Sequence, residues 1–300
     1  MPYAHGAERK PAYLSVTWPT MMKARGVRCI VMRIGSKQTH TGGVEIRFFL
    51  GTHRPTWLSK CEHDLFLSRR LLCERKSFPQ RIKGEWCLDS GGFTELRLHG
   101  KWTITAKQYA EELKRYSQIG GLHWAAQMDM MCEPVMVQKT GLSILEHQKA
   151  TVENFRELRS MNTGGVHVIP VLQGWTLDDY ERCFSMFEEN GFDLRDEPTV
   201  GLGSVCRRQS SDEIGEIVKH FFKKGLRLHG FGVKKAGLMK YGSMLQSADS
   251  MAWSYAARKR NGRCKDTSHH HTSKNCANCL TYALEWRKGL LSDYWPYCPE

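Results

Sequence analysis

Short apolar runs that end in glycine or polar residues alternate with amphipathic stretches along most of the chain. From Glu85 onward, each run is followed by a stretch whose apolar residues recur at helical spacing, and then by another run. This rhythm is typical of parallel β/α units. We expect strands at 86–88, 123–128, 166–172, 199–202, 226–232 and 247–249, and helices at 105–118, 142–161, 177–190, 211–224 and 238–246.

The ends of several helices carry recognisable signals. Thr105 and Thr176 precede helical stretches and are expected to act as N-caps, while Gly191 and Gly225 are expected to end helices. Three earlier runs, at 13–18, 28–34 and 44–50, are also predicted to be strands.

With these earlier runs, the number of strands approaches the eight that close a barrel. The sequence therefore predicts an α/β fold, a (β/α)8 TIM-like barrel. A doubly wound open sheet fits the same pattern, because periodicity does not reveal strand order.

The composition changes near the C-terminus. From Lys259 onward Lys, Arg, His, Cys and Asn dominate, so we expect a barrel domain at 1–258 and a basic tail at 259–300 that packs on it. Cys276 and Cys279 have the spacing with which two thiolates hold one tetrahedral ion.

One more cysteine and three adjacent histidines precede this pair. We predict a structural Zn²⁺ site formed by Cys264, His271, Cys276 and Cys279, with His269 as the replacement for His271. A helix at 280–288 is expected to anchor the site, and the alternative is that the histidines belong to a solvated loop.

The charge of the chain points to a polyanionic partner. Forty-four Lys and Arg against 31 Asp and Glu give a net charge of +13, which favours nucleic acid, although a solvated basic surface would give the same total. The sequence contains no 18-residue apolar stretch and no apolar run at its start. We therefore expect a soluble, cytoplasmic protein without membrane contacts.

Three of the predicted strands have an aspartate at their carboxyl end, namely Asp89, Asp129 and Asp249. In a parallel barrel, the loops after the strands converge at one end, where active sites lie. A single aspartate there is commonly an N-cap or a turn residue. Three converging carboxylates repel one another, and this repulsion favours a functional site.

The order of the segments carries a resemblance to a known family. The motifs are Asp-Ser-Gly-Gly-Phe at 89–93, Met-Asp at 128–129, Gln-Gly at 173–174, Gly-Leu-Gly at 201–203, Gly-Phe-Gly at 230–232, Asp-Ser-Met-Ala-Trp-Ser at 249–254 and Cys-Ala-Asn-Cys at 276–279. Over about 51–286 the chain resembles the tRNA-guanine transglycosylase superfamily. Its closest resemblance is to the phage and bacterial DNA-modifying branch, the DNA-guanine transglycosylases called deoxypurine-in-DNA protein A.

This resemblance implies a base exchange in two displacement steps. Asp249 resembles the nucleophile that attacks C1′ of the sugar and expels guanine, and Asp89 resembles the general acid/base that handles the proton of the leaving and entering bases. The logic is that of a retaining glycosidase, in which one carboxylate forms the covalent intermediate and the other moves protons.

The resemblance also implies a site for the base. Asp129 is similar to the aspartate that accepts hydrogen bonds from N1–H and the exocyclic amine of guanine. Gln173 and the backbone of Gly201 and Gly203 would face its other polar atoms. Ser90 belongs to the same set. Phe231, and also Phe93, are candidates for stacking on the base, or are plain core residues.

Two departures from the family pattern bear on these roles. The RNA-acting bacterial enzymes have a longer Asp-Met-Phe-Asp-Cys segment where this chain has Ala248-Asp249-Ser250, so the nucleophile is assigned from the shorter Asp-Ser form. Their usual pair of cysteines one residue apart before the Cys-x-x-Cys is also absent, which bears on the choice of metal ligands.

The polymer implied is DNA, with RNA as the less favoured substrate and a 7-deazaguanine, such as 7-cyano-7-deazaguanine, as the small-molecule substrate. The phosphate contacts expected are Arg258, Lys259, Arg260 and Arg263, which follow soon after Asp249. A homodimer is possible. The alternatives are a tRNA-guanine transglycosylase, a non-catalytic nucleic-acid-binding barrel, and a hydrolase of small nucleosides.

Overall fold

The computed structural model describes residues 46–78, 82–208, 210–271 and 274–294. The strands expected at 13–18 and 28–34 lie outside these residues. Within them, no helix is long and apolar enough to cross a membrane.

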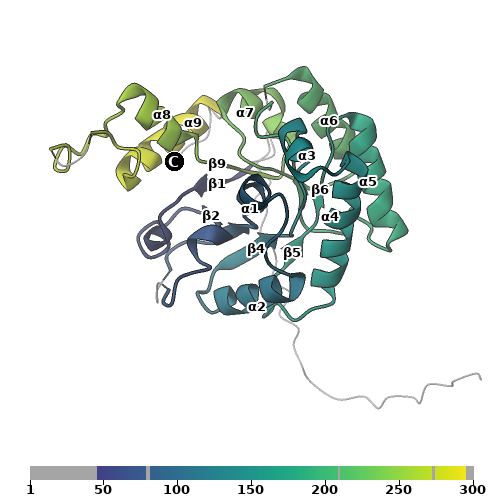
Figure 1. Ribbon diagram of the computed structural model, residues 1–300. Coiled ribbons are helices and arrows are strands. Elements are labelled where there is room, and N and C mark those ends of the chain that lie inside the picture. The colour runs from purple at the N-terminus through teal and green to yellow at the C-terminus, as the bar shows by residue number, and fades with distance from the viewer. Residues whose placement is uncertain (1–45, 79–81, 209, 272–273, 295–300) are drawn as a thin grey trace, which may run out of the picture. The chain divides into compact units, whose positions relative to one another are not determined.

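The core of the fold is a single sheet in which every strand pairing is parallel. Its order is β5-β4-β3-β2-β1-β9-β8-β7-β6 (Figure 1). The strands are β1 (Arg47–Gly51), β2 (Leu65–Ser68), β3 (Trp86–Asp89), β4 (Leu122–Ala126), β5 (Val168–Ile169), β6 (Val171–Leu172), β7 (Val200–Leu202), β8 (Leu228–Gly230) and β9 (Ser247–Ser250).

The two ends of this sheet meet at Pro170. The strand β5 pairs with β4, and β6 pairs with β7, yet β5 and β6 are consecutive parts of one run separated only by Pro170. Proline has no N–H to donate to the ladder, so it divides the strand without ending it. Its carbonyl accepts a hydrogen bond from Gly201 N at 2.8 Å. The sheet is therefore a closed ring of eight strands, as predicted, and the open doubly wound sheet is excluded.

Helices surround the ring (Figure 1). They are α1 (Gly92–His99), α2 (Ala106–Ser117), α3 (Pro134–Thr140), α4 (Ile144–Arg159), α5 (Leu177–Glu189), α6 (Asp212–Lys223), α7 (Lys235–Tyr241), α8 (Ala252–Arg260) and α9 (Leu280–Tyr294), with short 3-10 turns at Pro55–Ser59, Arg69–Leu71 and Gly242–Met244.

The predicted helix ends are confirmed. Thr105 and Thr176 each form a capping box, in which the threonine side chain accepts a hydrogen bond from the third residue of the helix. Gly191 and Gly225 follow α5 and α6 with φ angles of +83° and +87°, a conformation that favours glycine.

Several elements differ from the prediction, and the helices α1, α3 and α8 were not predicted. The strand β2 was also not predicted. With β2 included, the ring of described strands is complete from β1 to β9, and the runs at 13–18 and 28–34 are not needed to close it. The helix expected at 238–246 is instead α7, which begins three residues earlier and gives way to a 3-10 turn at Gly242–Met244.

Aromatic and aliphatic side chains fill the interior of the ring. The buried cluster consists of Phe49, Phe66, Cys87, Trp124, Ala126, Ile169 and Val171, and Phe231 packs against it. A Cβ atom at Gly201 would lie 2.6 Å from the Phe231 ring, so a side chain at this position would collide with the ring. This packing forms a floor beneath the carboxyl ends of the strands.

Candidate active site and metal centre

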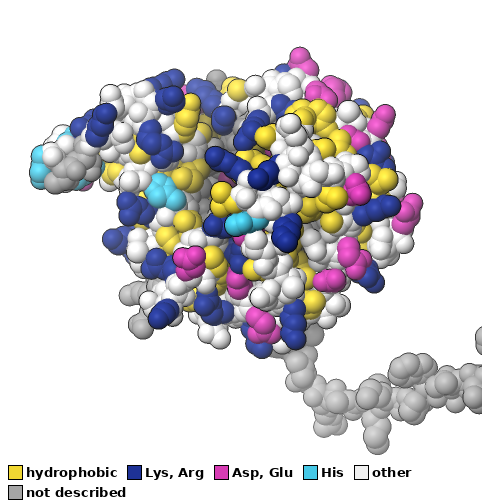
Figure 2. Space-filling model, viewed as in Figure 1, with side chains coloured by type: hydrophobic (Ala, Val, Ile, Leu, Met, Phe, Trp, Pro, Cys, Tyr) yellow, Lys and Arg dark blue, Asp and Glu magenta, His cyan; other side chains and the backbone are white. Residues whose placement is uncertain are grey.

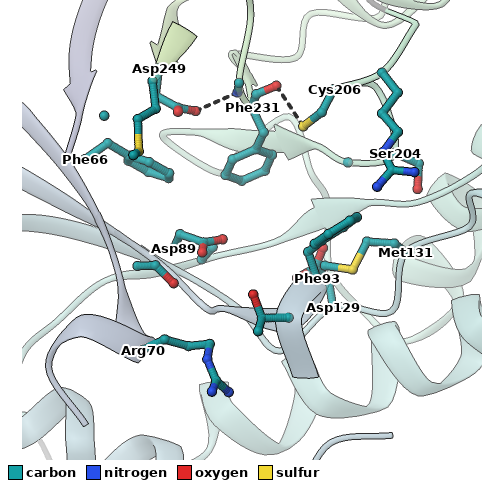
Figure 3. A pocket seen from close by; sticks show the side chains of 18 of the residues that line it. Phe66, Arg70, Asp89, Phe93, Asp129, Met131, Ser204, Cys206, Phe231 and Asp249 are labelled. Carbon is teal, nitrogen blue, oxygen red and sulfur yellow. Dashed lines mark hydrogen bonds between the residues drawn. The ribbon is translucent and has the colours of Figure 1, made fainter. Parts of the chain in front are cut away.

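A cavity of about 580 Å³ opens at the carboxyl ends of the strands. All three predicted aspartates line it (Figure 3). The other lining residues are Gly51, Thr52, His53, Phe66, Ser68, Arg70, Leu71, Phe93, Thr94, Ala126, Met131, Glu133, Gln173, Gly203, Ser204, Cys206, Arg207, Phe231, Gly232 and Met251. Its walls therefore come from the carboxyl ends of the strands of the ring and from the loops that follow them.

Asp249 is the third residue of β9 and is 6% exposed. Asp249 pairs with Phe49 of β1, so the register between β1 and β9 fixes its position along the axis of the ring. Its Oδ1 atom accepts a hydrogen bond from Gly232 N at 2.8 Å (Figure 3). The carboxylate is held at the cavity wall by a backbone donor.

Asp89 ends β3 and lies across the cavity from Asp249 (Figure 3). Burial raises the pKa of Asp89 to about 6, and the negative charge of Asp249 adds to this, while hydrogen bonds from Ser68 and Gly91 N–H oppose it. A carboxyl group with a pKa near neutral pH can both give and take a proton, as a general acid/base must.

Asp129 follows β4 and is 6% exposed. Burial raises its pKa to about 7, helped by the charge of Asp89. Its oxygens accept hydrogen bonds from Gln173 Nε2 at 2.5 Å and from Ser90 Oγ at 3.2 Å. These donors fix the plane of the carboxyl group.

The side chain of Ser204 sets the orientation of Gln173. Ser204 Oγ lies 2.6 Å from Gln173 Oε1, to which it donates, and accepts from Cys132 N at 2.7 Å. The amide of Gln173 is thereby turned with its nitrogen toward Asp129. Ser204 has a φ of +56°, a strained conformation for a residue with a side chain, and such strain is concentrated at functional sites.

Two of the predicted base-binding residues lie outside the lining of the cavity. Ser90 and Gly201 do not line the cavity; Ser90 donates to Asp129, and Gly201 makes room for the Phe231 ring. Gly203 lines the cavity, and a Cβ atom there would lie 2.2 Å from Gln173 Nε2. These three residues therefore shape the site through the side chains they contact.

Several residues that line the cavity were not predicted from the sequence. Ser68 is the last residue of the unpredicted strand β2, and Arg70 follows this strand. Glu133 and Ser204 come after strands that were predicted, and Glu133 Oε2 lies 3.2 Å from Ser204 Oγ. The polar segment that ends in Ser204 was visible as a strand end, but the sequence gives no signal that Glu133 turns inward.

The four predicted phosphate contacts are exposed and follow β9 closely in the sequence. Arg258, Lys259 and Arg260 form the last turn of α8, and Arg263 lies in the next loop. Figure 2 shows Lys and Arg side chains over the region of α8 and α9 and around the hollow in the same face. This face of the molecule can attract a polyanion.

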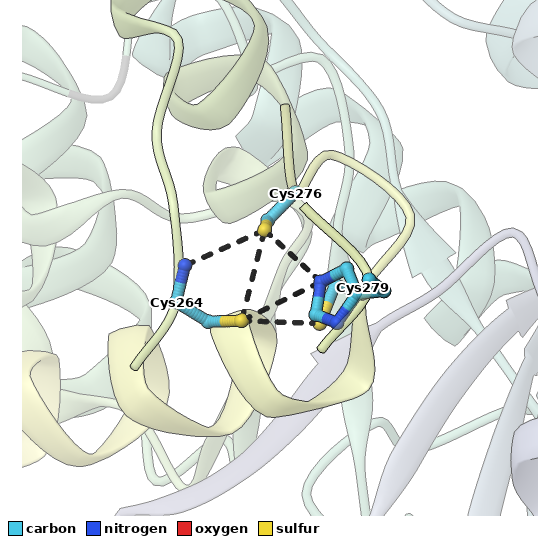
Figure 4. Close-up of side chains that lie close together, drawn as sticks. Cys264, Cys276 and Cys279 are labelled. Atoms are coloured by element: carbon cyan, nitrogen blue, oxygen red, sulfur yellow. Dashed lines mark hydrogen bonds between the residues drawn. The ribbon is translucent and has the colours of Figure 1, made fainter. Parts of the chain in front are cut away.

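Four side chains with metal-ligand atoms cluster in the C-terminal region (Figure 4). They are Cys264, His269, Cys276 and Cys279, and their ligand atoms all lie within 4.8 Å of one another. Three thiols and one imidazole are a donor set typical of structural Zn²⁺. The cluster can hold a tetrahedral metal ion.

The prediction of His271 as the fourth ligand is wrong. His271 is exposed, while His269 Nε2 lies 3.4 Å from Cys276 Sγ and 3.6 Å from Cys264 Sγ. His269 belongs to the cluster of ligand atoms, and the neighbouring His270 Nε2 also lies 3.7 Å from Cys264 Sγ and from Cys276 Sγ.

The cluster is tied to the helix that follows Asp249. Ser254 Oγ on α8 donates to Ala277 O at 2.8 Å, and Cys276 N donates to Gly262 O at 2.9 Å. A metal held here would connect the Cys276–Cys279 turn to the basic end of α8. With four protein ligands, its role would be structural.

We expect the Cys276→Ser, Cys279→Ser double variant to lose its zinc and to melt at a lower temperature. Two of the four ligands are removed, and structural zinc contributes directly to folding energy. Metal content by mass spectrometry and thermal melting measure the effect. The control is Cys73→Ser, outside the cluster; zinc retained in the double variant would contradict the assignment.

No curated protein matches the chain. A crystal structure of a Sinorhizobium meliloti protein, provisionally assigned as an isomerase and in an open-loop conformation, is similar with 10% identity and a TM-score of 0.36. The match covers 68% of this chain and 50% of that protein, and a similarity this low says nothing of function.

The family described as DeoxyPurine in DNA protein A, DpdA, matches residues 44–297. This segment contains every strand of the ring, all three aspartates and the metal cluster. The chain belongs to the DpdA family.

Proposed function

We propose that this protein exchanges guanine in DNA for a 7-deazaguanine, such as 7-cyano-7-deazaguanine, through a covalent glycosyl-aspartate intermediate. The observation that supports this most strongly is the meeting of Asp89, Asp129 and Asp249 in one cavity, in a chain of the DpdA family. A transglycosylase needs this combination of a nucleophile, an acid/base and a base-recognising group.

In the first step, Asp249 attacks C1′ of the target nucleotide and the bond from C1′ to N9 of guanine breaks. The electron pair leaves with guanine, and Asp89 supplies the proton that neutralises it. In the second step, Asp89 takes the N9 proton of the 7-deazaguanine, whose N9 attacks C1′ and releases Asp249. Each carboxyl returns to its initial state.

Recognition of the base is assigned to the wall around Asp129. An ionised Asp129 accepts from N1–H and the exocyclic amine of guanine, and the second N–H of Gln173 is available for the O6 oxygen. Adenine presents an acceptor at N1 and an amine in place of O6, so it would leave these groups unpaired. Phe93 and Phe231, on the cavity wall, supply flat faces for the base.

A guanine in duplex DNA must leave the base stack before Asp249 can reach its sugar. Base flipping costs roughly a few kcal/mol, and contacts to the flanking phosphates offset it. The basic end of α8 follows β9 directly, so it is suited to hold the strand beside the flipped nucleotide.

We expect replacement of Arg258, Lys259, Arg260 and Arg263 by glutamine to flatten the salt dependence of DNA binding. Each lost phosphate contact reduces the slope of log K against log [salt] by about 0.7–0.9. Binding titrations at several salt concentrations measure the slope. A matched variant replaces the exposed residues Lys149, Arg156, Lys219 and Lys223 on α4 and α6; an equal change in both variants would refute a specific role.

The proposed function is tested with labelled 7-cyano-7-deazaguanine and either guanine-containing DNA or tRNA. We expect label to enter DNA and a denaturant-resistant protein–DNA adduct to form when the incoming base is omitted. Label in tRNA alone would identify an RNA enzyme. Absence of exchange and of an adduct with both polymers would favour a non-catalytic binding barrel.

A further inference from the structure

His229 lies inside the ring directly below the proposed nucleophile. It is the middle residue of β8 and is fully buried. Its ring packs edge-on against Phe49, Trp124 and Phe231. An imidazole in such apolar surroundings is costly unless both nitrogens have a use.

The two ring nitrogens of His229 have different neighbours. Nδ1 lies 2.9 Å from Ser247 Oγ. Nε2 lies 3.4 Å from Asp249 Oδ1 and makes no hydrogen bond to any described residue. Among the described residues, the carboxylate oxygen within 4 Å of this nitrogen belongs to Asp249.

These neighbours select one tautomer. The hydroxyl of Ser247 can donate to Nδ1, which leaves the proton on Nε2, pointing toward Asp249. The opposite tautomer would place the lone pair of Nε2 against a carboxylate oxygen, which is repulsive. His229 is therefore a donor aimed at Asp249.

We infer that His229 is a positioning residue that, together with Gly232 N–H, holds Oδ1 of Asp249 and leaves Oδ2 as the attacking atom. The inference rests on the proposed function of Asp249. The distance of 3.4 Å is long for a hydrogen bond, and such contacts commonly tighten when substrate binds.

This arrangement affects the two chemical steps differently. When Oδ2 forms the bond to C1′, the carboxylate loses its charge; when that bond breaks, the electron pair returns and the charge spreads to Oδ1. Donors on Oδ1 stabilise the carboxylate more than the ester. His229 thereby favours release of the DNA from the intermediate over its accumulation.

The test compares His229→Leu with His229→Gln. Each protein is equilibrated with guanine-containing DNA at a fixed concentration of free guanine, and the share of denaturant-resistant adduct is measured. We expect the ratio of adduct to free enzyme to rise about tenfold in His229→Leu, the effect of losing a hydrogen bond to a charged group. Base exchange should slow, and the glutamine amide should restore both values most of the way.

An unchanged adduct ratio in a folded His229→Leu protein would overturn the inference and leave His229 as a core residue. If the leucine variant does not fold, His229→Asn makes the same comparison, because its amide reaches the place of Nδ1 but not that of Nε2. An adduct that survives Asp249→Asn would instead overturn the nucleophile assignment, and the inference with it.

Discussion

Asp249→Asn should abolish the denaturant-resistant adduct and reduce base exchange by roughly 10⁴-fold or more, the scale seen when a covalent nucleophile is removed. An amide is a poor nucleophile toward C1′, and no other described carboxyl takes its position at the end of β9. The amide oxygen can still accept from Gly232 N–H, so the fold should persist. Gel analysis of the adduct and incorporation of labelled base measure the two effects.

The variant should still bind free guanine, because Asp129 and Gln173 are unchanged. The exposed aspartate Asp196 provides the matched control, since Asp196→Asn alters an equal charge outside the cavity. If the adduct remained in Asp249→Asn and disappeared in Asp89→Asn, the roles of the two aspartates would be reversed.

Asp129→Asn should lose base recognition and gain stability at alkaline pH. Asparagine presents an N–H where the base also presents one, so we expect kcat/KM for base exchange to fall at least about 10³-fold, as for sites built to pair with a polar edge. The same change removes a buried carboxyl whose pKa is raised to about 7. A shift of that size corresponds to at most about 4 kcal/mol.

The pH dependence has a definite sign. Below about pH 4, Asp129 holds its proton in both the folded and the unfolded chain, so the carboxyl and the amide are equivalent. As the pH rises from about 4 to 7, the unfolded chain ionises this carboxyl while the folded protein keeps its proton, so the stability that protonated Asp129 contributes falls progressively and is lost above about pH 7. The melting temperature of Asp129→Asn should exceed that of the wild type at pH 8 by several degrees and match it near pH 4.

Melting curves at both pH values check this, with Asp196→Asn again as the control. An equal melting temperature at pH 8 would show that Asp129 is ionised there without a penalty. The same pKa predicts that wild-type exchange weakens below pH 7, because a protonated Asp129 accepts fewer hydrogen bonds from guanine.

The fold could be predicted from the sequence because its main signal is local. Alternating apolar runs and amphipathic helices from Trp86 to Ser250 mark the repeated β/α unit. Thr105 and Thr176 are the N-caps of their helices, and this signal is also local. The strand β2 escaped detection because it has four residues and is followed at once by Arg69 and Arg70. Its strand conformation depends on pairing with β1 and β3.

The candidate site was predictable only in part. The three aspartates stand at strand ends, where topology alone brings them together. The contacts of Ser204 and His229 depend on which side chains face them across the ring, and periodicity contains no such information. The choice between His269 and His271 depends on the direction of the backbone within one turn, which sequence spacing does not determine.

The pairing of β1 with β9 has a consequence for biosynthesis. Phe49 and Asp249 are register partners, although almost the whole ring separates them along the chain. Contacts between residues so far apart along the chain form slowly and late. The ribosome also synthesises β9, which contains Asp249, after all the other described strands of the ring. Under the proposed function, a nascent chain therefore has no assembled active site, and it can react with DNA only after the ring has closed.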